Sequence, residues 1–218
     1  MRAVVQKVTA ASVEVDGAVV SSIGTGLLCL VGLARTDTDA DATALARKIL
    51  RLRAFSKPAP EASAAAATDA TPPLQAAAPA APAAAPWTAS VADIGGEVLL
   101  VSQFTLHART RRARPDFSRA MPPGEAAGRW RDFVALVRRE AAAAGGKGVA
   151  DGAFGKMMHV RIHNDGPVTF LLDTDDAGWG AETASASAAA SEGAATAAAA
   201  EAEEEGEEEG RSQDKRRT

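Results

Sequence analysis

The apolar positions in the first part of the chain predict a series of strands. Residues 4–8 are rich in valine and predict a first strand. Residues 12–15 and 18–20 flank Asp16-Gly17, a dipeptide that strongly favours a hairpin turn. Residues 27–33 form an almost continuous apolar run, which is typical of a strand buried on both faces.

The apolar period then changes to that of a helix at two places. After Thr38, apolar side chains recur every three to four residues, at Ala42, Leu45, Ile49 and Leu52. Farther along, residues 122–125 (Pro-Pro-Gly-Glu) open a second, longer helix. Its apolar face is made by Ala127, Trp130, Val134, Val137 and Ala141.

Further strands are predicted around the second helix. Residues 91–94 predict a short strand that ends in a turn at Gly95-Gly96, and residues 97–103 predict a second buried strand. Residues 158–163 alternate between apolar and polar side chains, and residues 168–172 predict a last strand. We therefore expect an α+β fold: a compact, mixed β-sheet domain with about two main helices.

Two segments differ in composition from the rest of the chain. Residues 57–86 are mostly Ala and Pro, and residues 174–218 run through an Ala/Ser/Glu tract into an acidic block. Neither segment carries enough large apolar side chains to offset the entropy of an ordered chain. We expect one domain at 1–173, interrupted by a disordered insertion at 57–86 and followed by a disordered acidic tail.

Charge and composition limit the class of protein. The tail carries a net charge of -8, which leaves +4 on residues 1–173, so a polyanionic partner is compatible with the domain. No apolar run is long enough to span a membrane, and the N-terminus lacks a secretory signal. A single cysteine, Cys29, lies in the apolar run 27–33 and predicts a buried thiol in a reducing compartment. We expect a cytoplasmic protein without a membrane anchor.

Two short segments that lie beside predicted strands are candidates for a site. Ser102, Gln103, Phe104 and Thr105 end a buried strand, where backbone N–H groups become free to bind a ligand. Thr105 would need a base to act as a nucleophile, and no base is identifiable beside it. The second segment, residues 164–169, contains Gly166-Pro167: glycine permits close approach of the backbone to a ligand and proline allows a cis bond, and a plain tight turn is the favoured alternative on these residues alone. An ordinary strand end is the alternative for the first segment.

The arginines of one loop and the three histidines are weaker indications of a functional site than these two segments. A loop after the first segment carries four arginines, Arg109, Arg111, Arg112 and Arg114. They suit tRNA or other phosphates, and a solvated basic loop is an equal alternative. The chain has three histidines, His107, His159 and His163. His159 and His163 could lie on one face of a strand, but no Cys or acidic residue adds a credible third metal ligand, so structural or surface roles are favoured and no metal or cofactor is expected.

Together these motifs resemble the D-aminoacyl-tRNA deacylase family of the canonical bacterial and eukaryotic type. The resemblance covers nearly all of residues 1–56 and 87–173. It rests on the opening residues 1–8, on Ser102-Gln103-Phe104-Thr105-Leu106, and on Asn164-Asp165-Gly166-Pro167-Val168-Thr169. Two motifs in this order and separation make the resemblance specific.

The resemblance implies a barrel-like homodimer that hydrolyses the ester of D-aminoacyl-tRNA and also acts on glycyl-tRNA mischarged on tRNA-Ala. A Gly-cisPro element, here Gly166 and Pro167, is expected to enter the partner subunit's pocket and to reject L-amino acids sterically. Catalysis is expected from backbone N–H groups and the substrate's own 2′-OH, without a cofactor. An older idea for the family makes the residue matching Thr105 a nucleophile.

Residue by residue, the resemblance places Ser102, Gln103 and Thr105 at the reacting ester and Phe104 in the substrate pocket. It places Met158 near the adenine. The family usually has Arg where Lys7 stands, and that residue helps to fix the Gly-Pro element. Two alternatives therefore stay open: a nucleic-acid-binding module without catalysis, and a relaxed editor that also cleaves L-aminoacyl-tRNA.

Overall fold

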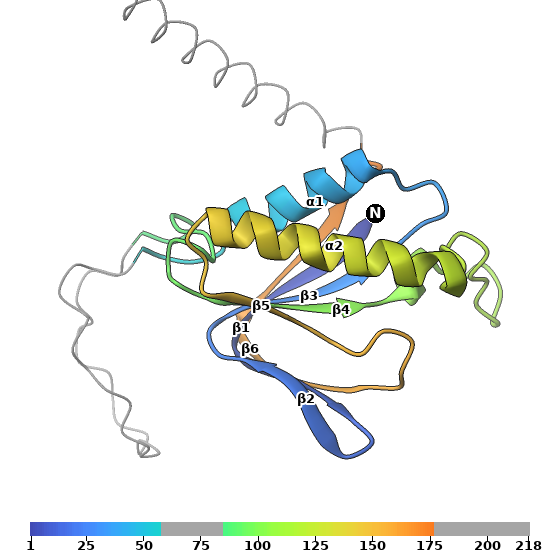
Figure 1. Cartoon of the computed structure of the whole chain (residues 1–218), viewed down its shortest axis with the longest axis horizontal. Helices are drawn as coiled ribbons and strands as arrows, with labels where there is room; N and C mark the ends of the chain where they lie inside the picture. Colours follow the sequence, from blue (N-terminus) through green and yellow to red (C-terminus); the bar gives the residue numbers. More distant parts are fainter. Residues whose placement is uncertain (58–84, 177–218) are drawn as a thin grey trace, which may run out of the picture. The chain divides into compact units, whose positions relative to one another are not determined.

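The computed structural model describes residues 1–57 and 85–176 (Figure 1). Contacts divide the chain after Thr174, and the fold described below is that of the first unit, Met1–Thr174. The disorder expected for residues 57–86 and 174–218 concerns segments that lie mostly outside the described residues.

The chain begins with one long strand where the sequence predicts two. Strand β1 (Arg2–Val15) continues through residues 9–11 and makes an antiparallel hairpin with β2 (Ala18–Ile23). Asp16 and Gly17 form the turn, both with positive φ (51° and 80°), which is the geometry that Asp-Gly favours. The hairpin prediction is confirmed, and the break expected near residue 9 is wrong.

The described strands make a mixed sheet. Strand β3 (Gly26–Gly32) pairs with β1 antiparallel, whereas β4 (Glu97–Ser102) and β5 (Gly148–Asp151) follow β3 in parallel. Strand β6 (His159–Asp173) runs antiparallel along the whole of β1, so the two last strands expected from the sequence are one. The sheet curls until β2 contacts β4 and β5, which gives a nearly closed, barrel-like sheet.

Two helices lie on the same side of this sheet (Figure 1). Helix α1 (Asp39–Arg51) starts with a capping box, in which Thr38 Oγ1 accepts from the N–H of Asp41 and the Asp41 carboxylate accepts from the N–H of Thr38. Helix α2 (Pro123–Ala143) starts with proline in its first turn. Both helices and the expected mixed α+β fold are confirmed.

Residues 91–94, expected as a strand, form a turn. The Ser90 hydroxyl and the Asp93 carboxylate bind each other and each other's backbone N–H, at 2.8 to 3.3 Å. This side-chain pair closes the backbone locally, and local bonds of this kind compete with strand pairing. The strand that was missed is β5, a four-residue strand with little apolar pattern.

The insertion leaves and re-enters the domain at one place. Phe55 and Ala89 exchange two backbone hydrogen bonds of 3.0 Å, and the N–H of Lys57 donates to Thr88 Oγ1 at 3.0 Å. The two ends of the segment between them are therefore held together by the domain itself.

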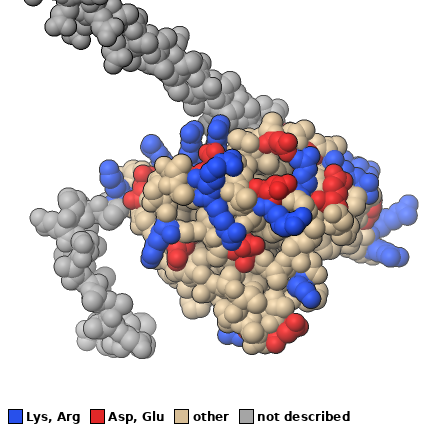
Figure 2. Space-filling model, in the orientation of Figure 1, with Lys and Arg blue, Asp and Glu red and all other residues tan. Residues whose placement is uncertain are grey.

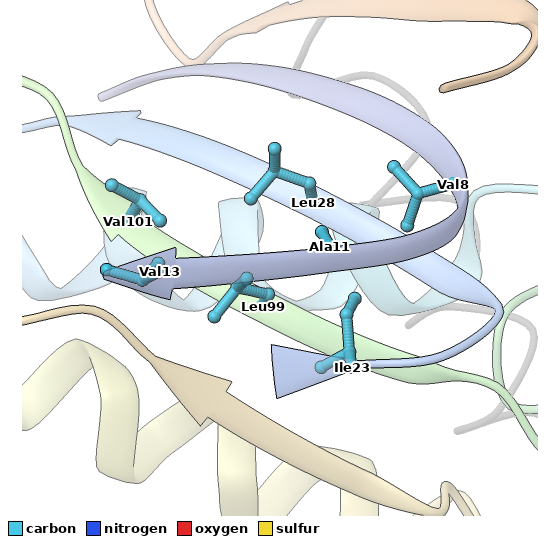
Figure 3. Packing of buried hydrophobic residues seen from close by; sticks show 7 residues of the cluster. All are labelled: Val8, Ala11, Val13, Ile23, Leu28, Leu99 and Val101. Carbon is cyan, nitrogen blue, oxygen red and sulfur yellow. The ribbon is translucent and has the colours of Figure 1, made fainter. Parts of the chain in front are cut away.

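The curled sheet encloses apolar side chains on the face away from the helices. Figure 3 shows this cluster, which joins residues of β1, β2, β3 and β4: Val8, Ala11, Val13, Ile23, Leu28, Leu99 and Val101. Cys29 is fully buried in β3, and burial raises the pKa of its thiol far above the ordinary range. The expectation of a buried thiol is confirmed.

Candidate functional site

The first sequence motif lies where β4 ends. Ser102 is the last residue of β4, the N–H of Gln103 donates to Val31 O at 2.8 Å, and a short 3-10 helix, η1 (Phe104–His107), follows. Gly32 allows η1 to approach, because a Cβ on Gly32 would lie 3.0 Å from Gln103 O and from His107 Cδ2.

Arg2 fixes η1 from the other side. Its Nη1 donates to Leu106 O at 3.2 Å, and its Nε donates to the Asp173 carboxylate at 2.7 Å. The position of η1 is thus tied to both β1 and the end of β6.

A cavity of about 500 Å³ opens beside the end of β4. Ser102, Gln103 and Phe104, three of the residues that the family resemblance places at the substrate, line it. The remaining lining residues come from the end of β3 and the residues after it, from the segment before α2 and its first turn, and from the segment before β6: Val31, Leu33, Arg35, Phe117, Ala120, Met121, Pro122, Pro123, Ala126, Phe154 and Gly155. The wall is mainly apolar, with a few polar groups, as in many small-molecule sites.

The lining offers no conventional acid or base. None of its described residues is Asp, Glu or His, and its one ionisable side chain is Arg35. Thr105 is outside the lining, and its Oγ1 accepts a hydrogen bond of 2.6 Å from Gln103 Nε2. Apart from Arg35, the polar groups that this described lining offers are a hydroxyl, an amide and the backbone.

The second motif forms a bulge in β6. Val8 pairs with Asn164 and Gln6 pairs with Thr169, so residues 165–168 lie opposite Lys7 alone. The Gly166-Pro167 peptide bond is cis, as the resemblance implies. Gly166 has a φ of 116°, which favours glycine, and a Cβ there would lie 2.7 Å from Val168 Cγ2. Gly166 and Pro167 are both exposed.

The side chain of Lys7 contacts the side chain of Asp165 in the bulge. Its Nζ lies 2.8 Å from the Asp165 carboxylate and 5.4 Å from the centre of the Phe55 ring. The pair is partly exposed, with 22% of the Lys7 and 40% of the Asp165 side chain accessible. Lys7 thus holds the residue before Gly166, within a single subunit.

The other predicted site residues lie apart from this cavity. Lys7, Gly166, Pro167 and Met158 are absent from its described lining. Met158 packs against the apolar cluster of the curled sheet, and its Sδ fills the space beside Gly152, 3.0 Å from where a Cβ would be. Within one chain, Gly166 and Pro167 are thus not among the described residues that line the cavity of Ser102, Gln103 and Phe104.

The four predicted arginines line a second, open concavity of about 740 Å³ with Pro115, Asp116 and Phe117. Arg109 and Asp116 exchange backbone hydrogen bonds of 2.8 and 2.9 Å, which close the base of this loop. Figure 2 shows Lys and Arg side chains protruding at the right-hand edge, where Figure 1 draws the chain between η1 and α2.

Histidines and metal ligands add no further site. His107 is buried with its Nε2 unpaired, whereas His159 and His163 are exposed. Among the described residues, no three His, Cys, Asp or Glu side chains are grouped to hold a metal ion. The same residues contain no helix long and apolar enough to cross a membrane.

Sequence reasoning missed Arg35 and Phe117 as pocket residues. Arg35 follows β3, and the ends of β3 and β4 lie side by side because these strands are parallel. Residues that follow β3 could therefore have been predicted to lie near Ser102 at the end of β4. Phe117 reaches the pocket by packing on Phe104, with ring centres 5.0 Å apart, and no local pattern reports such a contact.

Comparison with known proteins decides the family. A family model described as D-Tyr-tRNA(Tyr) deacylase matches residues 4–72 and 77–173. The chain belongs to the D-aminoacyl-tRNA deacylase family. The family resemblance of the two motifs is therefore confirmed, and members carrying this name are ester hydrolases.

Relatives of this deacylase family match over nearly their whole length. A D-aminoacyl-tRNA deacylase of Dehalococcoides mccartyi is 42% identical over 81% of this chain and 96% of its own. The enzyme of that name from Schizosaccharomyces pombe is 38% identical over 81% of this chain and 100% of its own.

Solved structures share the deacylase fold. One called c-Myc DNA Unwinding Element Binding Protein is 36% identical, with a TM-score of 0.64 over 81% of this chain and all of its own. A probable eukaryotic D-amino acid tRNA deacylase, 16% identical, has a TM-score of 0.59 over 79% of this chain and 98% of its own, which supports the fold alone.

Proposed function

We propose that this protein hydrolyses the ester that joins a D-amino acid to the terminal adenosine of tRNA, releasing the free D-amino acid and tRNA. The observation that carries the proposal is the match to deacylases along almost their entire length, at 38% and 42% identity. The placement of Ser102 and Gln103 in the wall of a cavity of suitable size supports it.

The composition of the cavity favours a substrate-assisted reaction. Because the described lining has no carboxylate or imidazole, the 2′-OH of the substrate's terminal ribose is assigned to assist the attacking water by a hydrogen bond, and the proton of that water leaves with the ribose hydroxyl that the ester releases. Ser102, Gln103 and nearby backbone N–H groups orient the ester and stabilise the oxyanion. Phe104 contacts the terminal nucleoside, and Met158 is assigned to the adenine side through the family resemblance.

A nucleophilic role for Thr105 ranks second. Its Oγ1 accepts from Gln103 Nε2 instead of donating to a base, and an unactivated hydroxyl is a weak nucleophile. The role assigned to Thr105 is instead to accept the hydrogen bond that orients the side-chain amide of Gln103.

Stereospecificity is assigned to Gly166 and Pro167 acting across a homodimer. The two residues are exposed and lie outside the described lining of their own chain's cavity, so insertion into a partner's cavity brings the motifs together. Large apolar side chains are exposed on the same strand and at the pocket: Leu171 is 71% and Phe104 56% accessible. Such exposure is common where a partner covers the surface.

A filter of this kind rejects a side chain of the L configuration and has no means of rejecting glycine. Glycyl-tRNA, including glycine mischarged on tRNA-Ala, is therefore a proposed second substrate. If Lys7 holds the bulge more loosely than an arginine would, the protein becomes a relaxed editor that also cleaves L-aminoacyl-tRNA. Arg109, Arg111, Arg112 and Arg114 are assigned to tRNA phosphates.

A nucleic-acid-binding module without catalysis is the second candidate. The solved structure that is 36% identical is named as a DNA unwinding element binding protein, and the arginine-lined concavity suits a polyanion. In this reading the Ser102–Thr105 segment is structural, so Gln103→Ala and Thr105→Ala leave polyanion binding intact.

The deciding experiment compares hydrolysis of D-Tyr-tRNA and L-Tyr-tRNA by the full chain with EDTA present. Rapid loss of the D-ester alone supports the stereospecific, metal-independent deacylase. Loss of both esters identifies the relaxed editor. Loss of neither, from a folded protein, leaves the binding module.

A further inference from the structure

The arginine-lined concavity and the apolar cavity are neighbours. Phe117 belongs to the described lining of both, and Phe117 packs edge-to-face on Phe104 of the apolar cavity, with ring centres 5.0 Å apart and planes at 69°. A ligand that leaves the apolar cavity on this side therefore meets the arginine loop, residues 109–116.

The arginine loop is held in shape while its charges stay available. The backbone bonds between Arg109 and Asp116 close it, and the Asp116 carboxylate accepts from the N–H and Oγ of Ser118 at 2.8 and 3.0 Å. Within the described part of the chain, Arg111, Arg112 and Arg114 form no ion pair. Their guanidinium groups are free to bind phosphate oxygens.

Aromatic faces lie beside these cations. The side chains of Phe104 and Phe117 are 56% and 39% exposed. Exposed rings next to a row of cations are the combination that binds single-stranded nucleic acid: bases stack on the rings while phosphates follow the charges. Bases inside a duplex have no free faces to stack.

Arg35 adds a cation to the wall of the apolar cavity, and it contacts the segment that follows the arginine loop. Its Nε donates to Ser118 O at 2.9 Å and its N–H to Arg119 O at 3.2 Å, which holds the exposed side chain against the segment that joins the arginine loop to α2. Arg35 also lines the apolar cavity. Positive charge thus continues from the loop to the cavity mouth.

We propose that these groups form a track for the unpaired nucleotides that precede the terminal adenosine of the substrate. The 3′ nucleoside occupies the apolar cavity against Phe104, the base before it stacks on Phe117, and Arg35 and the arginine loop bind the connecting phosphates. The inference rests on the proposed function for the identity of the nucleic acid. It adds that recognition requires a single-stranded 3′ end and extends beyond one nucleotide.

The test measures binding by fluorescence anisotropy with the full chain. The probes are an uncharged RNA hairpin with four unpaired 3′ nucleotides ending in CCA and the same hairpin with a blunt end. The track predicts at least tenfold tighter binding of the hairpin with the unpaired end. Equal affinity for both hairpins would overturn the proposal in favour of duplex or unspecific phosphate binding.

Variants locate the track. Arg111→Gln with Arg112→Gln should raise the Kd for the unpaired end about tenfold and lower the slope of log K against log salt by about 1.4, the loss of two phosphate contacts on a single strand. Phe117→Leu should raise the Kd at least fivefold through lost stacking. The matched control, Arg131→Gln with Arg139→Gln on α2, removes the same charge from exposed sites and should change the Kd less than twofold.

Equal losses in the α2 control and the loop variant would show that net charge alone acts, and would overturn the track. Hydrolysis of D-Tyr-tRNA separates this outcome from failure of the proposed function. A protein that binds the unpaired end but leaves the ester intact keeps the track and loses the deacylase. A deacylase whose kcat/KM for D-Tyr-tRNA is unchanged by the loop variants loses the track.

Discussion

The ammonium group of Lys7 lies 2.8 Å from the carboxylate of Asp165, so β1 holds the residue that precedes Gly166 through an ion pair. The pair is partly exposed, and pairs of this kind contribute on the order of 1 kcal/mol or less to stability. Its importance is therefore positional: it restrains residues 165–168, the larger of the two places where the pairing of β6 with β1 shifts register.

Replacing Lys7 tests this restraint. Lys7→Met should lower the ratio of D-Tyr-tRNA to L-Tyr-tRNA hydrolysis about tenfold, while the melting temperature changes by only a few degrees, because the pair contributes little to stability. Lys7→Arg should keep the ratio. The control Arg161→Met breaks a second ion pair between β6 and β1, with Glu14, away from the bulge, and should leave the ratio unchanged. An unchanged ratio in Lys7→Met contradicts the positional role.

The approach of η1 to β3 depends on Gly32. A methyl group at Gly32 would press on Gln103 O and the His107 ring, each 3.0 Å from its position, and would shift the Gln103 amide. We expect Gly32→Ala to lower kcat/KM for D-Tyr-tRNA at least tenfold in a protein that still folds. Gly24→Ala, where the nearest atom is a flexible Glu97 oxygen at 3.5 Å, is the matched control and should retain activity. Equal activity of the two variants would show that η1 tolerates the shift.

The pKa of the Asp116 carboxyl group should be measurably low. Hydrogen bonds from the Ser118 backbone and hydroxyl, with a smaller effect of Arg109, favour the carboxylate and hold its pKa below the ordinary 3.8. Because the pKa is lower in the folded than in the unfolded protein, the contribution of this carboxylate to stability is complete at neutral pH. It is lost as the pH falls below 3.8 and through the lower pKa of the folded state. An NMR titration of the carboxyl carbon checks the value, and Ser118→Ala should raise it. A pKa at or above 3.8 in the unaltered protein contradicts the hydrogen bonds at the base of the arginine loop.

The cluster inside the curled sheet should dominate stability on the face away from the helices. Leu28 is fully buried there, and Leu28→Ala should lower the free energy of unfolding by about 2–5 kcal/mol through lost burial and a residual cavity. Val19→Ala, on the exposed hairpin strand β2, should cost about 0.5 kcal/mol or less. Urea denaturation measures both, and similar losses would mean that the cluster collapses around the truncated side chain.

Cys29 should be inert in the native protein. Its thiol is buried in β3, and its raised pKa keeps it protonated at physiological pH. A thiol reagent such as DTNB should leave the native chain unlabelled for hours and should label one thiol at once in guanidinium chloride. Fast labelling without denaturant would show that β3 opens readily.

Elements with a clear period were predictable from sequence, and those that depend on partners distant in the chain were not. Thr38 and the apolar spacing after it specify α1, and Asp16-Gly17 specifies its hairpin, because each signal acts within a few residues. Strand β5 exists because β4 pairs with it, and its four residues carry no pattern of their own. The turn at 91–94 depends on one Ser90–Asp93 contact that overrides an apolar run.

The candidate site divides in the same way. Ser102, Gln103 and Phe104 were placed from the motif at the end of a strand, and they line the cavity. Phe117 and Arg35 arrive by packing and by strand order, which are properties of the folded domain. The Lys7–Asp165 contact follows from the bulge, whose extra residues cannot be counted before the register of β6 on β1 is known.

The paired hydrogen bonds of Phe55 and Ala89, reinforced by Lys57 and Thr88, have a consequence for how this gene changes with time and for protein engineering. Because the domain itself brings these ends together, its fold does not require a segment of fixed length between them, and for a flexible insert each doubling of length costs only about 0.6 kcal/mol of closure entropy. Gain or loss of residues between Lys57 and Ala85 is then expected to change the stability of the domain very little. The same position is a suitable insertion site for a fluorescent protein or an affinity tag.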